Sequence, residues 1–157
     1  MKLFFAGSED KSLYPMLVEA GVVNFLYSFY AIRGKPFHDY NEKHSIFVDS
    51  GGFVARTRGV KISVEEYADY LTRNKMSDRP NVVYANLDLA ETEGTLQNQA
   101  YLESRGLKPI PVFHYTELKE GRKDLLEEYC KNNDYIAVGG MAGTGLSGKL
   151  KRYFLDY

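Results

Sequence analysis

Residues 45–59 read SIFVDSGGFVARTRG. The apolar run 46–48 ends at Asp49, and the two glycines that follow favour a turn. Short runs of β-branched and aromatic residues that stop at such a turn are typical of strands buried inside a sheet. The stretch therefore predicts a buried strand that ends at an acid and leaves through a glycine turn.

The same alternation of apolar runs and amphipathic segments continues in both directions from this strand. We predict strands over residues 3–6, 23–29, 45–48, 82–87, 109–114 and 135–138. We predict helices over residues 13–20, 64–73, 95–104, 122–131 and 149–156. Strands that alternate with helices indicate a parallel α/β sheet with crossover helices. Because the strand runs are apolar on both faces, we expect both faces of the sheet to be covered.

Two helix ends carry local signals. Ser63 followed by Glu66 fits a capping box that opens the helix over 64–73, and Gly106 marks the end of the helix over 95–104. The chain shows no linker, low-complexity run or internal repeat. With 157 residues and a mass of 17.9 kDa, residues 1–157 are expected to form one domain.

The overall composition limits the classes of partner. Twenty basic and 21 acidic residues leave a formal net charge of -1, so no global field attracts nucleic acid or an anionic membrane. A site for a polyanion must therefore be local. The 13 tyrosines and nine phenylalanines favour packing over stacking on bases as their main role.

Cysteine usage and the amino-terminal residues indicate the compartment. Cys130 is the only cysteine, which excludes an intramolecular disulfide and a Cys-rich zinc cluster and favours a reducing compartment. The start MKLFFAG contains too few consecutive apolar residues for the core of a signal peptide or for a membrane span. We expect a cytoplasmic protein with no metal and no cofactor.

Polar residues and glycines follow most of the predicted strands. They are Gly7, Ser8, Asp49, Ser50, Gly51, Gly52, Asp88, His114, Gly139 and Gly140. In α/β barrels and doubly wound sheets, active sites are built at the carboxyl ends of the strands. These strand ends together form the candidate site.

Asp49 is the first candidate for chemistry. An acid at the rim of a dry sheet has its pKa raised by desolvation, and it can then act as a general acid, a general base or a nucleophile. Gly51 and Gly52 leave the backbone open to a flat ligand, and Phe53 could cover the face of that ligand. In the alternative interpretation, Asp49 only forms an Asx turn with the glycines. Spacing alone leaves the two interpretations equal.

Four stretches resemble one family in order and spacing. DSGGF (residues 49–53) is similar to the DSGGFQ motif of the tRNA-guanine transglycosylases, and more closely to their phage and bacterial relatives that insert 7-deazaguanines into DNA. VVYANLDL (82–89), KPIPVFHY (108–115) and DYIAVGGMAG (134–143) resemble further segments of these proteins. The resemblance implies a TIM (β/α)8-barrel-like fold, of which this chain holds about six βα units.

The resemblance also implies roles for individual residues. Asp49 would be the active-site carboxylate, and Asp88 would bind the guanine-type edge. His114 stands where the tRNA enzymes have glutamine. The remaining substrate-binding residues would be Ser50, Gly51, Gly52, Phe53, Gly139, Gly140 and Met141. For Asp88 the alternative is capping ahead of Glu91 and Thr92, and for His114 it is a purely structural role.

The implied reaction is base exchange, in which guanine in a nucleic acid is replaced by a 7-deazaguanine without a cofactor. DNA is the favoured prediction for the nucleic acid, and tRNA is the alternative. One aspartate attacks the anomeric carbon, while another acid moves protons on the bases. Such a protein is expected in the cytoplasm of a bacterium or a phage-infected cell.

The chain departs from the family in three ways. Val54 replaces the glutamine of DSGGFQ, the Cys-rich zinc segment is absent, and nothing in KRYFLDY (151–157) matches the motif of the family's nucleophilic aspartate. We therefore assign no nucleophile. We expect a truncated or split protein whose activity needs a complementing chain or a homodimer.

Basic residues suggest two further interpretations. GTGLSGKL (143–150) has the spacing of a phosphate-binding loop, but Leu150 replaces the residue that would hold magnesium. The residues that could instead hold a nucleic-acid backbone are Arg56, Arg58, Lys61 and Lys149. A solvated basic loop is the alternative for the first three.

As a whole, the chain could also be a non-catalytic module that binds nucleic acid or a partner half-barrel, or a nucleotide binder through residues 143–149.

Overall fold

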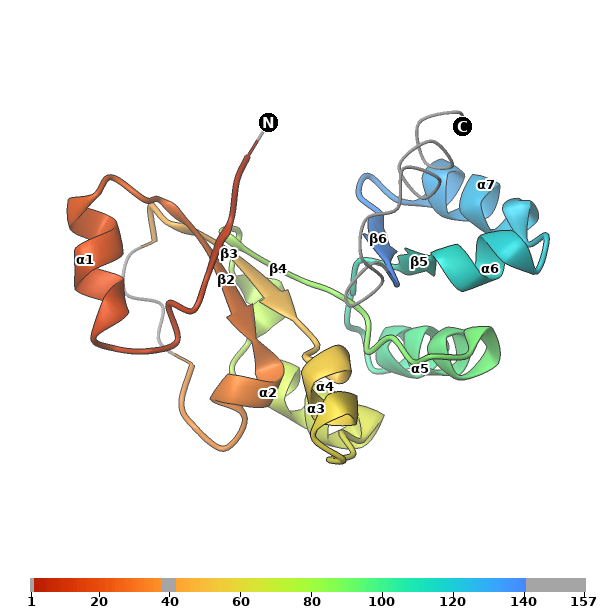
Figure 1. Ribbon diagram of the computed structural model, residues 1–157, viewed down its shortest axis with the longest axis horizontal. Coiled ribbons are helices and arrows are strands. Elements are labelled where there is room, and N and C mark those ends of the chain that lie inside the picture. The colour runs from red at the N-terminus through yellow and green to blue at the C-terminus, as the bar shows by residue number, and fades with distance from the viewer. Residues whose placement is uncertain (1, 38–41, 141–157) are drawn as a thin grey trace.

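The computed structural model describes residues 2–37 and 42–140 (Figure 1). The strands are β1 (Phe5–Ala6), β2 (Asn24–Ser28), β3 (Ser45–Asp49), β4 (Val82–Tyr84), β5 (Val112–His114) and β6 (Ala137–Gly139). The helices are α1 (Leu13–Glu19), α2 (Phe29–Ile32), α3 (Gly52–Thr57), α4 (Val64–Arg73), α5 (Thr92–Ser104), α6 (Tyr115–Lys119) and α7 (Lys123–Asn132), with a 3₁₀ helix, η1, at Met76–Asp78. The predicted α/β alternation is confirmed, and the helix predicted over 149–156 lies outside the described residues.

The paired strands are parallel and follow one another in sequence order. β1, β2, β3 and β4 form one sheet, and β5 pairs with β6. A parallel bridge between Ala85 and Ile110 links the two sheets. It is held by hydrogen bonds from Asn86 N–H to the Ile110 carbonyl, 2.9 Å, and from Ile110 N–H to the Tyr84 carbonyl, 2.8 Å. The predicted parallel α/β sheet is thus confirmed.

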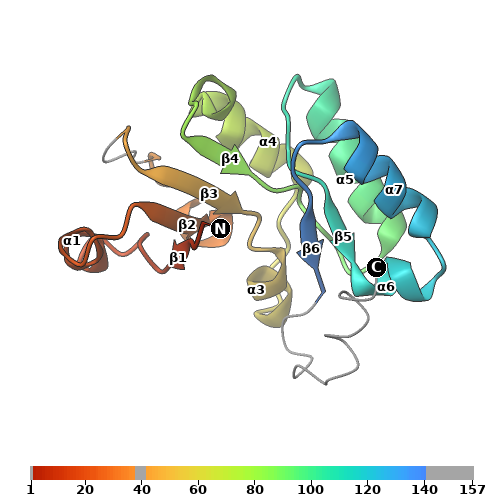
Figure 2. The ribbon, with the colours of Figure 1, turned by 90° about the horizontal axis from the view of Figure 1, so that it is seen from above.

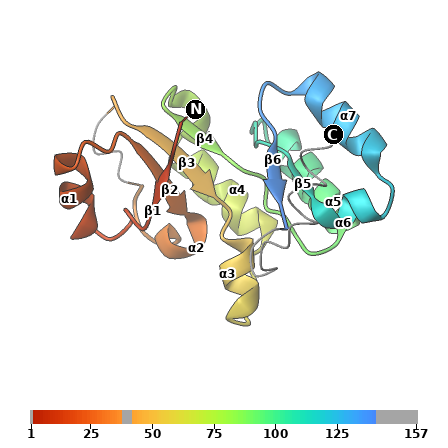
Figure 3. The same ribbon diagram turned by 45° about the horizontal axis from the view of Figure 1, so that its top comes forward.

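The orientation of the strands brings their carboxyl ends to one side. The arrowheads of β2, β3 and β6 point toward the side of the molecule where α3 lies (Figure 3). Figure 2 shows β5 and β6 with α5, α6 and α7 on one side of the molecule and β1 to β3 on the other. The loops that follow these carboxyl ends can therefore build a common site.

Helices bury one face of the first sheet. Phe25 and Ile46 belong to a buried cluster that includes Tyr67 of α4. The ring of Phe29 lies 4.8 Å from that of Tyr67 and 5.2 Å from that of Tyr70, measured between centroids. A second cluster, formed by Phe113, Leu118, Leu125 and Tyr129, packs under β5. Tyrosine and phenylalanine thus serve largely as core residues, as the composition favours.

The other face of this sheet is not fully buried, and the expectation that both faces are covered is wrong for the described residues. Leu26, Phe47 and Val83 stand next to one another in register. Val83 is 36% exposed, and in the second sheet Val138 of β6 is 41% exposed. The strand runs look uniformly apolar because this second face is also apolar, although no described helix buries it completely.

Both predicted helix ends are confirmed, and of the predicted capping box the bond to the Ser63 side chain is present. α4 spans the predicted residues, and its N-cap Ser63 accepts a hydrogen bond from the Glu66 N–H at 3.1 Å. α5 ends in a Schellman motif, in which Gly106 takes a φ of 75° and donates to the Glu103 carbonyl at 2.9 Å. Leu107 completes this motif by donating to the Leu102 carbonyl at 3.1 Å.

Three short helices and η1 have no counterpart in the prediction. α2 follows β2 directly, α3 starts at Gly52, and α6 follows β5 directly. The N-cap of α3 is Gly51, which has no side chain that could cap the helix. Two successive glycines favour a turn by composition, so α3 carries no start signal that a sequence could display. Among the described residues, no helix combines the length and the apolar character needed to cross a membrane.

Two buried tyrosines of α4 provide a matched test of the junction between the sheets. The hydroxyl of Tyr67 donates to the Ala85 carbonyl at 2.8 Å, whereas that of Tyr70 has no hydrogen-bond partner among the described residues. Tyr67→Phe is expected to lower the free energy of unfolding by about 1–2 kcal/mol, because it leaves a buried carbonyl unpaired. Tyr70→Phe is expected to change it by less than about 0.5 kcal/mol. Urea denaturation of both variants checks this, and equal losses would contradict the assigned bond.

Candidate functional site

Asp88 lies at the centre of the side chains that the carboxyl ends bring together. The Ser50 hydroxyl, just beyond β3, donates to Asp88 Oδ1 at 2.9 Å. His114 Nε2, at the end of β5, lies 2.9 Å from Asp88 Oδ2. Ser50 is fully buried, while the Asp88 side chain keeps 26% of its surface exposed. A carboxylate held from two strand ends thus presents its remaining surface to solvent.

His114 has a second acidic neighbour, which the sequence analysis missed. The backbone N–H of His114 donates to Glu117 Oε2 at 2.7 Å, and His114 Nδ1 lies 3.7 Å from Glu117 Oε1. Glu117 is fully buried in α6. The available signal was its position three residues after the strand end, where the acid of a capping box stands.

The charges of this cluster support one another. Burial alone would lower the pKa of His114, but the hydrogen bond to Asp88 and the negative charges of Asp88 and Glu117 outweigh it and raise the pKa to about 9. Burial alone would raise the pKa of Asp88, but hydrogen bonds from His114 and Ser50 outweigh it and hold the pKa below its usual value. At neutral pH the pair is therefore an imidazolium beside a carboxylate.

Asp49 differs from Asp88 in its electrostatics. Burial raises the pKa of Asp49, and the carboxylates of Asp88 and Glu9 add to the increase against a hydrogen bond from Gly51. That bond, from Gly51 N–H to Asp49 Oδ2, is 2.9 Å long and forms the Asx turn of the alternative interpretation. Asp49 thus forms the turn and also has a raised pKa. The pKa values of Asp49 and Asp88 are displaced in opposite directions.

The glycines of the motif pack closely against protein atoms, and Gly52 also lines the open cleft described below. Gly51 has a φ of 71°, and a Cβ there would lie 2.6 Å from the Tyr30 Cβ. A Cβ on Gly52 would lie 2.9 Å from the Asp88 carbonyl oxygen. These positions therefore need glycine for close packing of the chain against itself.

Gly139 and Gly140 lie against the His114 ring. A Cβ on Gly139 would come within 2.6 Å of His114 Cδ2 and 2.7 Å of its Nε2. Gly140 takes a φ of 75°. The structure thus brings the end of β6 to the same site, where Gly139 packs against the His114 imidazole. Met141 lies outside the described residues.

An open cleft of about 630 Å³ runs between α3 and the loop over 87–91. Asp88, Gly52, Arg56 and Lys61 are among the residues that line it. Asp49 and His114 do not line this cleft. Asp88 is therefore the member of the acid and histidine cluster that reaches the cleft from the described part of the chain.

The predicted basic residues separate into different environments. Arg56 and Lys61 line the cleft, and the Arg56 guanidinium lies 5.7 Å from the ring of Phe53, which is 41% exposed. Arg58 instead lies 5.7 Å from the Tyr30 ring. Lys149 and the whole loop over 143–149 lie outside the described residues.

Asp88 does not cap α5, so the capping alternative for it is wrong. The N-cap residue of α5 is Glu91, and Thr95 Oγ1 receives the Leu89 N–H at 2.9 Å. The side chain of Asp88 is instead committed to Ser50 and His114. The Asp88 side chain therefore contacts other strand ends and not the N-terminus of α5.

A second cleft, of about 670 Å³, lies beside the loop after β1. Glu9, Lys11 and Lys35 are among its lining residues. Glu9 Oε1 accepts the Ser28 N–H at 2.7 Å, so this acid fixes the end of β2. The second cleft therefore has both acidic and basic lining residues, and its acid Glu9 is already hydrogen-bonded to the backbone of Ser28.

Comparison of the chain with protein-family models, with curated proteins and with solved structures finds no match. Within residues 2–37 and 42–140, no group of three His, Cys, Asp or Glu side chains could hold a metal ion.

The raised pKa of His114 predicts a pH dependence of stability. A histidine with a folded pKa of about 9 and a usual value of 6.5 contributes its full stabilisation below pH 6.5 and loses it as the pH rises through about 9. We expect the free energy of unfolding to fall across this window, and to fall much less in His114→Gln. Urea denaturation at a series of pH values measures both, and identical slopes would contradict the ion pair.

Gly139→Ala is expected to push the His114 ring away from Asp88. The added methyl group would overlap the ring, at a cost of about 1–3 kcal/mol in unfolding free energy. Val138→Ala, at the exposed neighbouring position, should cost less than about 1 kcal/mol. Thermal or urea unfolding of the two variants decides the matter, and a neutral Gly139→Ala would rule out the close approach.

Proposed function

We propose that this protein binds guanine-type bases at Asp88 and exchanges guanine in a nucleic acid for a 7-deazaguanine, with DNA favoured over tRNA as the acceptor. The observation that carries the proposal is Asp88, a residue that lines an open cleft and whose partly exposed carboxylate is held by Ser50 and His114. The motifs around it resemble those of the tRNA-guanine transglycosylases. Resemblance and geometry point to the same residue from separate directions.

The carboxylate suits the hydrogen-bonding edge of guanine. Each oxygen of an ionised carboxylate can accept more than one hydrogen bond, and each Asp88 oxygen receives one from the protein. The remaining capacity matches the ring N–H and the exocyclic amine of guanine or a 7-deazaguanine, which are two parallel donors. Adenine carries an acceptor in place of that ring N–H. Bound adenine would place the lone pair of this ring nitrogen against the negative Asp88 carboxylate. We therefore expect the site to exclude adenine.

Asp49 is the proposed acid and base of the exchange. Its raised pKa brings it closer to the range in which a carboxyl group can both give and take a proton. In the exchange, a nucleophilic carboxylate forms a bond to the anomeric carbon as the bond to guanine breaks, and the departing base gains a proton. The incoming base then loses its proton as it displaces the carboxylate. The nucleophile is assigned to no described residue.

The proposal includes a TIM-barrel-like architecture and a nucleic-acid ligand. The parallel strands follow one another in sequence order, as neighbours do in such a barrel. The exposed Val83 and Val138 would be covered by further strands, from a complementing chain or a second copy. Arg56 and Lys61 line the same cleft as Asp88, so a phosphate could lie near the bound base.

Binding without turnover is the second candidate function. It is favoured by the engagement of Asp49 in the Asx turn and by its position away from the lining of the cleft. In that case the protein would recognise a guanine base in a nucleic acid, and the exchange chemistry would be absent. The two candidates share the role of Asp88 and differ only in the role of Asp49.

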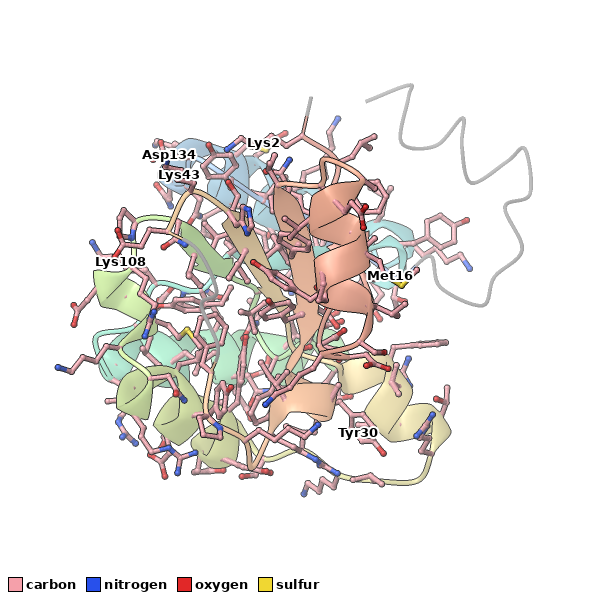
Figure 4. The ribbon with its side chains drawn as sticks, turned by 90° about the vertical axis from the view of Figure 1, so that its left-hand side faces the viewer. Lys2, Met16, Tyr30, Lys43, Lys108 and Asp134 are labelled. Atoms are coloured by element: carbon pink, nitrogen blue, oxygen red, sulfur yellow. The ribbon has the colours of Figure 1, made fainter. Side chains whose placement is uncertain are left out.

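Guanine binding tests the shared claim. Isothermal titration calorimetry is expected to detect guanine binding, and no comparable binding of adenine. Asp88→Asn should weaken it by about 10- to 100-fold, because it removes a charged acceptor. Asp134→Asn is the control, since Asp134 is exposed, lies at the upper edge of the view in Figure 4, and does not line the cleft that Asp88 lines. Equal affinity of the Asp88 variant and the control would contradict the proposal.

Incorporation of labelled guanine into DNA separates exchange from binding. Asp49→Asn is expected to abolish incorporation while leaving the guanine affinity within about threefold of the parent value. Incorporation that survives Asp49→Asn would exclude the acid–base role. Binding with no incorporation by the unsubstituted protein would favour the second candidate.

A further inference from the structure

We propose that Glu117 is a positioning residue of this site, which fixes the imidazole of His114 and, through it, the orientation of the Asp88 carboxylate in the cleft. The inference rests on the proposed function only for the identity of the ligand. Glu117 itself does not line the cleft. It therefore acts through His114.

Two anchors connect Glu117 to His114. Oε2 accepts the His114 backbone N–H at 2.7 Å, which ties the first turn of α6 to the end of β5. Oε1 lies 3.7 Å from Nδ1 of the same residue and has no hydrogen-bond partner among the described residues. The first contact fixes the backbone of His114, and the second places a negative charge beside its ring.

The burial of Glu117 indicates that its charge has a role. A fully buried carboxylate is costly unless it is paired, and helix capping alone could be provided by an uncharged side chain. Besides His114, Tyr129 of α7 lies near it, and burial together with the neighbouring Glu117 raises the pKa of Tyr129 to about 12. Tyr129 is neutral at ordinary pH, so the imidazolium is the partner that offsets the charge of Glu117.

The ring of His114 is then confined on three sides. Asp88 lies at Nε2, Glu117 lies near Nδ1, and Gly139 approaches the edge formed by Cδ2 and Nε2. A neutral imidazole could place its lone pair on Nε2 and face the Asp88 carboxylate with an acceptor. With a carboxylate at each nitrogen, both nitrogens carry protons. Nε2 then remains a donor to Asp88 and holds its carboxylate in one orientation.

Titration of His114 by NMR tests the assignment directly. Glu117→Gln retains an oxygen that can accept the backbone N–H and removes only the charge. The pKa of His114 is expected to fall by about one unit or more in this variant. Glu120→Gln is the matched control, because Glu120 is an exposed acid at the end of the same helix, and it should leave the titration unchanged. An unchanged His114 titration in Glu117→Gln would overturn the proposal.

The unsubstituted protein offers a test that does not depend on the folding of a variant. Nitrogen-15 shifts of the His114 ring at neutral pH are expected to show both nitrogens protonated, and a ring with one unprotonated nitrogen would overturn the proposal. Guanine affinity is the functional readout, with a loss of about tenfold expected in Glu117→Gln and none in Glu120→Gln. If the parent protein binds no guanine, the proposed function fails, while the ring titration still decides the role of Glu117.

Discussion

The ion pair between Asp88 and His114 is the contact on which the candidate site depends. It joins the residues that follow β4 to the end of β5, the two segments that the Ala85 bridge also links. The bridge sets the strands in register, and the ion pair fixes their carboxyl ends. Because Ser50 reaches the same carboxylate from β3, three strand ends converge on Asp88. A ligand-binding carboxylate held in this way is oriented before any ligand arrives.

Much of the fold could be predicted from the sequence, because its main signals are local. The Ser63 cap and the amphipathic pattern after it define α4, and the apolar run before Asp49 defines β3. The short helices were missed because they have few residues and, in α3, a start at Gly52 without a polar cap. The exposure of Val83 could not be predicted, since an apolar run looks the same whether or not its second face is covered.

The sequence predicted that Asp88 and His114 belong to one site, but not which atoms they contact. Strand-end positions were enough to select Asp88 and His114, because parallel strands gather their carboxyl ends. Which atoms meet is a matter of three-dimensional packing. The hydrogen bond from Ser50 and the close approach of Gly139 to the imidazole therefore have no signature in the sequence. Glu117 was overlooked because an acid early in a helix usually serves only the helix itself.

The most direct test of the central claim is a crystal structure of the protein with 7-deazaguanine bound. The account predicts that the base lies in the cleft between α3 and the loop over 87–91. Its ring N–H and exocyclic amine should both donate to the Asp88 carboxylate, with Ser50 and His114 still bound to that carboxylate. A base found in the cleft beside Glu9, or one held without any contact to Asp88, would contradict the account.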